Sequence, residues 1–178
     1  MIVCAGRNEV FPFATTIGVG LIESAINLTR QCLFDKPEYL LFVGSAGSYG
    51  EHKIFDIIES KRAANIELSF LTNSSYTPLD NVLESENRFA RNDTIVNSSN
   101  YISTNSELTK NFKEYGIGIE NMEFFSVLSV AKQFEIPVAG IFVVTNFTDE
   151  NAHEDFMKNH KVAMEKLTNY LVEKQIIK

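Results

Sequence analysis

Three short stretches of the sequence place small or polar residues directly after apolar runs, where they could bind or transform a ligand. They are "GSAGSYG" after Val43, "ENME" after Ile119 and "TNFTD" after Val144. If the apolar runs are strands of an open α/β sheet, ligands bind beyond the carboxyl ends of those strands. The sequence therefore predicts a binding or catalytic site at these three turns.

Each turn offers a different chemistry. The small residues around Ser45 let backbone N–H groups and a hydroxyl approach an anion or a sugar closely, but no Lys-Ser/Thr pair follows them as in a P-loop. Glu123 precedes an almost wholly apolar segment, where a carboxylate must be paired, placed at a helix N-terminus or used in function. Asn146 by itself fits a turn former or a helix cap.

The composition excludes several function classes. A chain of 178 residues with 44% hydrophobic and 22% charged residues fits one globular domain, residues 1–178. The net charge of −7 argues against a nucleic-acid partner, which would need clustered Lys and Arg. No stretch approaches the roughly 20 apolar residues of a membrane span, and the first residues do not resemble a signal peptide, so we expect a cytoplasmic protein without membrane contact.

Cysteine and histidine spacing gives no sign of a metal. Cys4 and Cys32 show neither metal nor redox spacing, so we expect reduced thiols in the core. His52, His153 and His160 lack the i, i+4 spacing of metal ligands, so we expect them to be structural or solvent-facing.

The elements that must position these turns alternate between β and α. Apolar runs and helical periodicity predict an α/β sandwich with a mixed, mainly parallel central sheet flanked by helices on both sides. A second extended run is expected at 10–18, and the polar stretch 72–93 is expected to be a long loop or lid. The predicted strands are 1–5, 38–44, 53–60, 65–71, 93–98, 117–120 and 136–146, and the predicted helices are 20–34, 104–116, 122–134 and 153–174.

Two blocks of the sequence resemble the purine nucleoside phosphorylase and nucleosidase superfamily, which includes the MTA/SAH nucleosidases. In "IGVGLIESAINLTRQCLFDKPEYLLFVGSAG", a Gly-x-Gly entry leads to a helix, a strand and a Gly-Ser-Ala-Gly turn. "NMEFFSVLSVAKQFEIPVAGIFVVTNFTDENAHEDF" has the Met-Glu helix, the Ile-Pro strand and the turn before the last helix. The resemblance covers roughly 17–50 and 94–172, and it implies a short, divergent member with the nucleoside phosphorylase-like three-layer sandwich.

The resemblance implies roles for several residues. Glu123 matches the carboxylate that hydrogen-bonds the ribose 2′ and 3′ hydroxyls and stabilises positive charge on the sugar in the transition state. Met122 would pack on the sugar or the base. Tyr101 would stack on the purine, and Ile102 would close its pocket with backbone groups. The nucleophile would be bordered by Gly44, Ser45, Ala46 and Gly47.

At the position of Asn146, the nucleosidases of the family that this chain resembles have an Asp, which protonates purine N7. The Thr-Asn pair is similar to that of the trimeric phosphorylases for 6-oxopurines. An amide cannot be a general acid, but it can both donate and accept hydrogen bonds, matching O6 and N7 of guanine or hypoxanthine. The resemblance therefore implies a 6-oxopurine preference.

The N-terminal residues do not decide whether water or phosphate is the nucleophile. The phosphate-binding Arg of the six-subunit phosphorylases is absent before the Gly-Ser turn, where this chain has Phe42-Val43. If the first strand matches that of the family, Glu9 corresponds to the carboxylate that activates water in nucleosidases, and Arg7 lies where phosphorylases begin their phosphate loop. Alternatively, residues 1–18 match a later hairpin of the family, and neither residue inherits a role.

These implications favour an enzyme that cleaves the N-glycosidic bond of a purine nucleoside by phosphorolysis, with phosphate as co-substrate and no other cofactor. The catalytic residues would be Glu123, Asn146 and Glu9. Hydrolysis of an MTA/SAH- or futalosine-type nucleoside is the alternative, with Glu9 as the base toward water. A non-catalytic nucleoside-binding homologue is the third hypothesis. Family members assemble as dimers, trimers or hexamers, so the resemblance implies a homo-oligomer.

Overall fold

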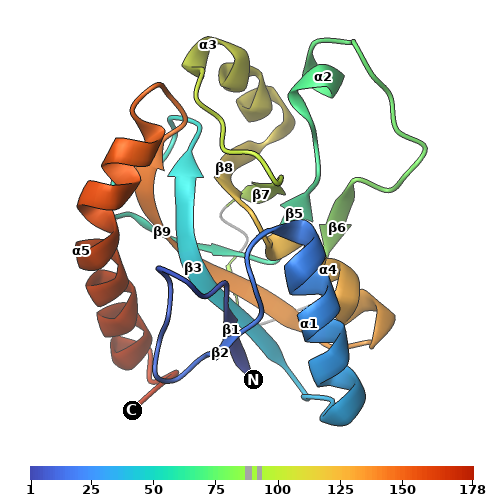
Figure 1. The fold of residues 1–178 in the computed structure, drawn as a ribbon, viewed down its shortest axis with the longest axis vertical. Coiled ribbons are helices and arrows are strands. Elements are labelled where there is room, and N and C mark those ends of the chain that lie inside the picture. Colours follow the sequence, from blue (N-terminus) through green and yellow to red (C-terminus); the bar gives the residue numbers. More distant parts are fainter. Residues whose placement is uncertain (87–89, 92–93) are drawn as a thin grey trace.

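Two long strands form the middle of the central sheet (Figure 1). The structure is a computed structural model that describes residues 1–86, 90–91 and 94–178. Strands β3 (Leu40–Ser48) and β9 (Val138–Phe147) run parallel, paired from Leu40 opposite Val138 to Ser48 opposite Phe147. Both strands are buried along almost their whole length, as expected for apolar runs covered on both faces.

The remaining strands extend this pair into a mixed, mainly parallel sheet, which confirms the predicted fold class. β1 and β2 lie in parallel beside β3, while β8 meets the end of β3 in antiparallel orientation. β7 and β5 continue in parallel beyond β8, and β4 pairs antiparallel with β9. The bounds are β1 (Ile2–Cys4), β2 (Thr15–Thr16), β4 (Ile57–Ser60), β5 (Arg62–Ala64), β6 (Val82–Glu84), β7 (Ile95–Ser98) and β8 (Ile117–Asn121).

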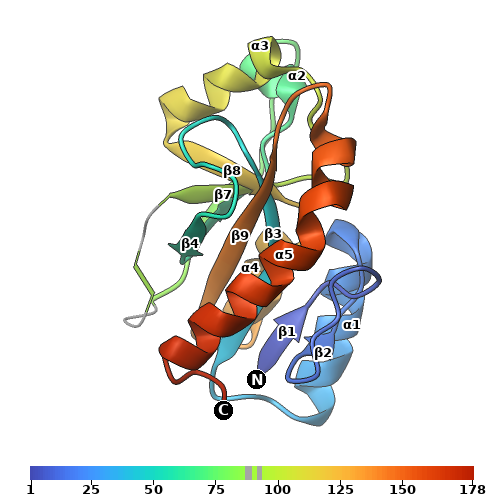
Figure 2. The same ribbon diagram turned by 90° about the vertical axis from the view of Figure 1, so that its left-hand side faces the viewer.

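Helices cover both faces of the sheet. Figures 1 and 2 show α5 (Ala152–Glu173) along one face of β3 and β9, with α1 (Gly20–Phe34) and α4 (Phe124–Gln133) on the other side. Short helices α2 (Leu68–Leu71), α3 (Ser106–Thr109) and the 3₁₀ helix η1 (Lys110–Tyr115) lie beyond the end of the sheet. None of the helices in the described residues is long and apolar enough to cross a membrane.

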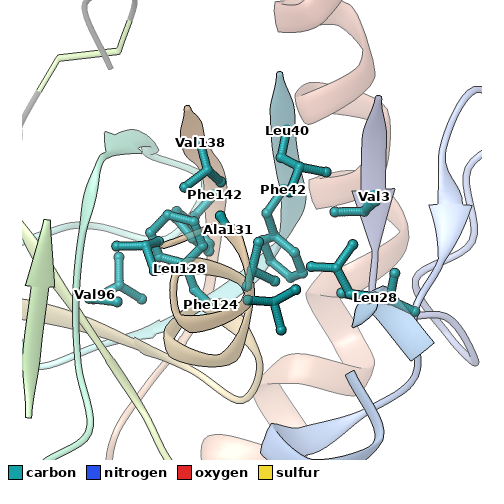
Figure 3. Close-up of a cluster of buried hydrophobic side chains, with 14 of the residues drawn as sticks. Val3, Leu28, Leu40, Phe42, Val96, Phe124, Leu128, Ala131, Val138 and Phe142 are labelled. Carbon is teal, nitrogen blue, oxygen red and sulfur yellow. The ribbon is translucent and has the colours of Figure 1, made fainter. Parts of the chain in front are cut away.

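Alternating residues of β3 feed two separate apolar cores, because successive side chains of a strand point to opposite faces. Leu40 and Phe42 pack toward α1 and α4, while Leu41 and Val43 pack toward α5. In the first core, drawn in Figure 3, the ring of Phe42 lies 6.0 Å from that of Phe124, centre to centre. Burying a side chain of this size contributes about 1.5–3 kcal/mol, so the two cores hold the sheet rigid beneath its carboxyl ends.

Several predicted boundaries are wrong. Residues 65–71 were expected to form a strand, but the strand is β5, just before them, and Leu68–Leu71 form α2. The one helical turn lets Leu68, Phe70 and Leu71 pack against a single small core, which the alternation of a strand would not allow. The expected extended run 10–18 forms regular strand only at Thr15–Thr16.

The predicted loop 72–93 is interrupted by β6, which pairs antiparallel with β5, and part of it lies outside the described residues. The predicted helix 104–116 is divided into α3 and η1, and it ends as expected at Gly116, which has φ 71°.

The small-residue stretch is not a turn. β3 continues through Gly44–Ser48 because these residues keep pairing with β9, and the chain turns only afterwards. Between the pairs Ala46–Val144 and Gly47–Asn146, β9 contains one extra residue, Thr145. Such a bulge changes the direction of a side chain locally and is common beside functional sites.

Candidate active site

A cavity of about 250 Å³ lies at the carboxyl ends of β1, β3, β8 and β9. This is the edge of the sheet that the sequence indicated. Apart from Gly44, the residues predicted to be catalytic or to contact the substrate or nucleophile line it: Arg7, Glu9, Ser45, Ala46, Gly47, Tyr101, Ile102, Met122, Glu123 and Asn146. Arg7, Tyr101 and Ile102 are exposed and lie at the rim, while the three proposed catalytic side chains are buried.

Glu123 lies between the starts of two helices. Its Oε1 accepts a hydrogen bond of 2.9 Å from the backbone N of Gly20, at the first residue of α1. The side chain of Asn121 accepts from the backbone N of Glu123 and of Phe124, at 2.8 and 2.9 Å, and so caps the start of α4. The carboxylate is therefore paired at a helix N-terminus and still borders the cavity.

The surroundings of Glu123 favour its protonated form. Only 3% of the residue is exposed, and this burial, followed by the negative charge of Glu9, raises the pKa of Glu123 to about 8. The N–H of Gly20 acts in the opposite direction. With this pKa, the protonated form of Glu123 is favoured at neutral pH, and a ligand that supplies hydroxyl donors or positive charge would favour release of the proton.

Glu9 is held against β3 by a turn. Gly6 and Glu9 exchange backbone hydrogen bonds of 3.2 and 2.9 Å, and Arg7 between them has φ 55°. The Oε1 of Glu9 accepts from the backbone N of Ser45, at 3.1 Å, and from its hydroxyl. A Cβ on Gly44 would stand 3.0 Å from the Oε2 of Glu9, so a side chain at this position would crowd the carboxylate.

Burial raises the pKa of Glu9, whereas the two Ser45 donors and the positive charge of His160 lower it. Glu9 and Glu123 are thus two buried carboxyl groups that share one cavity, and the charge of Glu9 opposes the ionisation of Glu123. Two such groups titrate as a pair, and environments that push their pKa values apart are typical of acid–base sites.

Asn146 is fixed by its neighbours in the bulge of β9. Its Oδ1 accepts from the hydroxyl of Thr145 at 2.8 Å, and its Nδ2 donates to the carbonyl of Phe147 at 3.0 Å. An amide has two N–H donors and two lone pairs on oxygen, so one of each remains for a ligand. Gly47 gives this side chain room, because a Cβ there would lie 3.0 Å from the Nδ2 of Asn146.

The structure also brings residues into the cavity that the sequence did not single out. Asn121 caps α4 and donates to the carbonyl of Ser45 at 3.2 Å, and its signal was an Asn between a strand and a helix. His153, expected to be structural or solvent-facing, is exposed and lines the rim together with Phe156. Glu120 also lines the cavity, and only its position at a strand end indicated it.

The first strand bears on the N-terminal alternatives. β1 and β2 run parallel, so residues 1–18 do not form a hairpin, whose strands would be antiparallel. β1 also pairs in parallel with β3, and this pairing places Arg7 and Glu9, which follow β1, at the cavity. Among the described residues, no group of three or more His, Cys, Asp or Glu side chains could hold a metal ion.

Comparisons with known proteins agree on the fold. The chain is similar to the 5′-methylthioadenosine/S-adenosylhomocysteine nucleosidase from Helicobacter pylori with butyl-thio-DADMe-Immucillin-A (TM-score 0.80, 16% identity, 97% of this chain and 95% of that one). It is also similar to the native futalosine hydrolase of Helicobacter pylori (0.79, 17%, 96% and 94%). A third similar structure is the nucleosidase from Neisseria meningitidis in complex with methylthio-immucillin-A (TM-score 0.75, 15% identity, 93% of this chain and 93% of that one).

The sequence itself gives a narrower match. The family model of the phosphorylase superfamily matches residues 93–174, the block that holds Glu123 and Asn146. No curated protein sequence matches the chain. Residues 93–174 thus match the phosphorylase superfamily in sequence, and nearly the whole chain shares the fold of the nucleosidase and hydrolase structures, as the resemblance seen in the sequence implied.

Proposed function

We propose that this protein hydrolyses the N-glycosidic bond of a purine nucleoside, preferably one with a 6-oxopurine base. The observation that carries the proposal is the pair of buried carboxyl groups, Glu9 and Glu123, in one cavity with Asn146. A base toward water, a group for the sugar hydroxyls and a group for the leaving base are the three functions that this cleavage needs.

Water is favoured over phosphate as the nucleophile, contrary to the preference drawn from the sequence. The N–H and hydroxyl of Ser45, the donors that a phosphate would need, both hydrogen-bond Glu9 instead. A phosphate dianion beside Glu9 would also meet a buried carboxylate, while Arg7 is exposed at the rim. The three similar structures named above are two nucleosidases and a hydrolase, which supports the same choice.

In the proposed mechanism, Glu9 takes a proton from a water molecule that attacks the anomeric carbon of the ribose. Glu123 binds the ribose hydroxyls, and its ionisation becomes more favourable as positive charge develops on the sugar. As the bond from water oxygen to the anomeric carbon forms, the bond from that carbon to the base nitrogen breaks. The purine leaves as an anion that Asn146 hydrogen-bonds, and the proton taken up by Glu9 then passes to it through solvent. Met122 packs on the sugar or base, Tyr101 and Ile102 bind the base at the rim, and the reaction uses no cofactor.

The test is release of hypoxanthine from inosine by the purified protein, with and without phosphate. Hydrolysis predicts free ribose and a rate that does not depend on phosphate. Phosphate-dependent release of ribose 1-phosphate would instead establish a phosphorylase. Adenosine, 5′-methylthioadenosine and futalosine extend the panel, and nucleoside binding without any base release would identify a non-catalytic homologue.

Replacing Asn146 by Asp is expected to change base preference. An aspartic acid can protonate a leaving purine, whereas the amide can only hydrogen-bond it, so adenosine-type bases should gain relative to 6-oxopurines. We expect the ratio of kcat/KM for adenosine over inosine to rise at least about tenfold. Asn151→Asp, at the exposed start of α5, is the matched control. An unchanged ratio in Asn146→Asp would exclude a role for Asn146 in base recognition.

We also propose that the protein is a homo-oligomer. α1 exposes Ile22 and Ile26, at 69% and 55%, on the side where Asn100 hydrogen-bonds the N of Leu21. Tyr101 and Ile102 at the rim of the cavity are exposed as well, so the apolar surface reaches the proposed site. Sedimentation velocity tests this directly: a monomer at micromolar concentration would contradict it, and Ile22→Glu with Ile26→Glu should shift an oligomer toward monomer.

A further inference from the structure

Glu120 is a buried carboxylate in the cavity that the proposed hydrolysis does not use. It lies in β8 opposite Gly47 and is only 9% exposed. Its Oε1 accepts from the backbone N of Ser103 at 3.0 Å. Its Oε2 accepts from the hydroxyls of Ser103 at 2.6 Å and of Tyr49 at 2.9 Å. Three donors thus surround a side chain whose burial raises its pKa.

Two of these donors belong to the segment that carries the rim of the cavity. Residues 99–105 form neither helix nor strand, and Tyr101 and Ile102 within them are exposed by 79% and 51%. At its beginning, Asn100 accepts from the N of Leu21 at 2.8 Å, which fastens the segment to α1. At its end, both hydrogen bonds of Ser103 go to Glu120. Tyr101 and Ile102 therefore lie between two residues, Asn100 and Ser103, that are held by hydrogen bonds to other parts of the chain.

The third donor makes Glu120 a fixed support. Tyr49 is 5% exposed, its ring stacks on that of Phe112 with centres 4.4 Å apart, and it also receives a hydrogen bond from Asn97 at 3.5 Å. Glu120 thus joins residues 99–105 to a packed core, since Tyr49 and Phe112 belong to the same cluster. The attachment lies at the end of the cavity where Asn146 is placed, because both side chains approach Gly47.

We propose that Glu120 is a positioning residue, which acts through Ser103 to hold Tyr101 and Ile102 over the base end of the cavity. Both of its oxygens are occupied by Ser103 and Tyr49, so in this role its loss should weaken substrate binding and leave the chemical step intact. The part of this proposal that concerns the substrate rests on the proposed function. The part that concerns the conformation of residues 99–105 does not.

Glu120→Gln is the principal variant, because it keeps the shape of the side chain. One of its two terminal groups becomes an NH₂ group, which cannot accept a hydrogen bond, so the three donors of Ser103 and Tyr49 can no longer all be satisfied. We expect the amides of the peptide covering 99–105 to exchange with deuterium at least tenfold faster than in the wild type, with exchange in α4 unchanged. With inosine, we expect KM to rise about tenfold and kcat to stay within twofold. Ser103→Ala, which removes one donor, should raise the exchange rate of 99–105 and the KM by smaller factors.

Glu107→Gln makes the same charge change on an exposed residue of the adjoining helix α3, and it should leave both quantities unchanged. Unchanged exchange in Glu120→Gln overturns the proposal, as does a loss in kcat with KM unchanged. If Glu120→Gln does not fold, the same comparison with Ser103→Ala decides. If the wild type releases no base, the proposed hydrolysis has failed, whereas the exchange result still tests Glu120.

Discussion

Replacing Glu9 by Gln is expected to lower kcat for base release about 10³-fold with little change in KM, because a positioned general base contributes 10²–10⁴. Glutamine has the same shape and its carbonyl oxygen can still accept the hydrogen bonds of Ser45, so the cavity should keep its form. The amide cannot take a proton from water. The measurement is steady-state release of hypoxanthine from inosine at neutral pH, with calorimetry to show that the variant still binds nucleoside.

Glu173→Gln is the matched control, since this exposed carboxylate ends α5 away from the cavity. A kcat for Glu9→Gln within threefold of the wild type would exclude Glu9 as the base. The same variant separates the two nucleophiles. If phosphate were the nucleophile, removing the charge of Glu9 would lower its repulsion from the dianion, and the phosphate-dependent rate should rise instead of falling.

The order of elements around this site could be predicted because each has a strong local pattern. Two-sided apolar runs gave β3 and β9, and helical periodicity gave α1 and α4. The placement of Glu123 and Asn146 at one edge followed from the rule that strand ends meet there. What failed was short or composed of small residues: the strand through Gly44–Ser48 looks like a turn when its neighbours are unknown.

The partners of the buried carboxyl groups could not be predicted, because they come from distant parts of the chain. Gly20 donates to Glu123 across 103 positions, and Ser45 donates to Glu9 across 36. No local period encodes such pairs, which arise when the sheet brings its strand ends together. The bulge at Thr145, which sets Asn146 opposite Gly47, likewise depends on the register of two strands.

Replacing Glu123 by Gln is expected to remove activity and to stabilise the fold at alkaline pH. In the folded protein, the pKa of Glu123 is raised from 4.5 to about 8, chiefly by burial and then by the charge of Glu9. Between these two values the folded state keeps a proton that the unfolded state has lost. The free energy of unfolding therefore falls as pH rises through this window, by up to about 1.4 kcal/mol per pH unit.

A glutamine at position 123 cannot titrate, so this pH dependence should be absent from the variant. Relative to the wild type, Glu123→Gln should be more stable at pH 9 than at pH 5 by a few kcal/mol, measured by urea unfolding followed by circular dichroism. Its kcat/KM for inosine should fall about 10²–10³-fold, as when one preorganised electrostatic group is removed from a site.

The charge of Glu9 offers an internal check on this result. Because the charge of Glu9 helps to raise the pKa of Glu123, Glu9→Gln should narrow the pH range over which the free energy of unfolding falls. In the double variant, neither position should contribute to the pH dependence of the free energy of unfolding. A stability difference between Glu123→Gln and the wild type that is the same at both pH values would contradict a protonated Glu123 in the empty site. Lost activity with the expected alkaline gain would instead mean that the fold tolerates the cost of this buried group for the sake of its substrate.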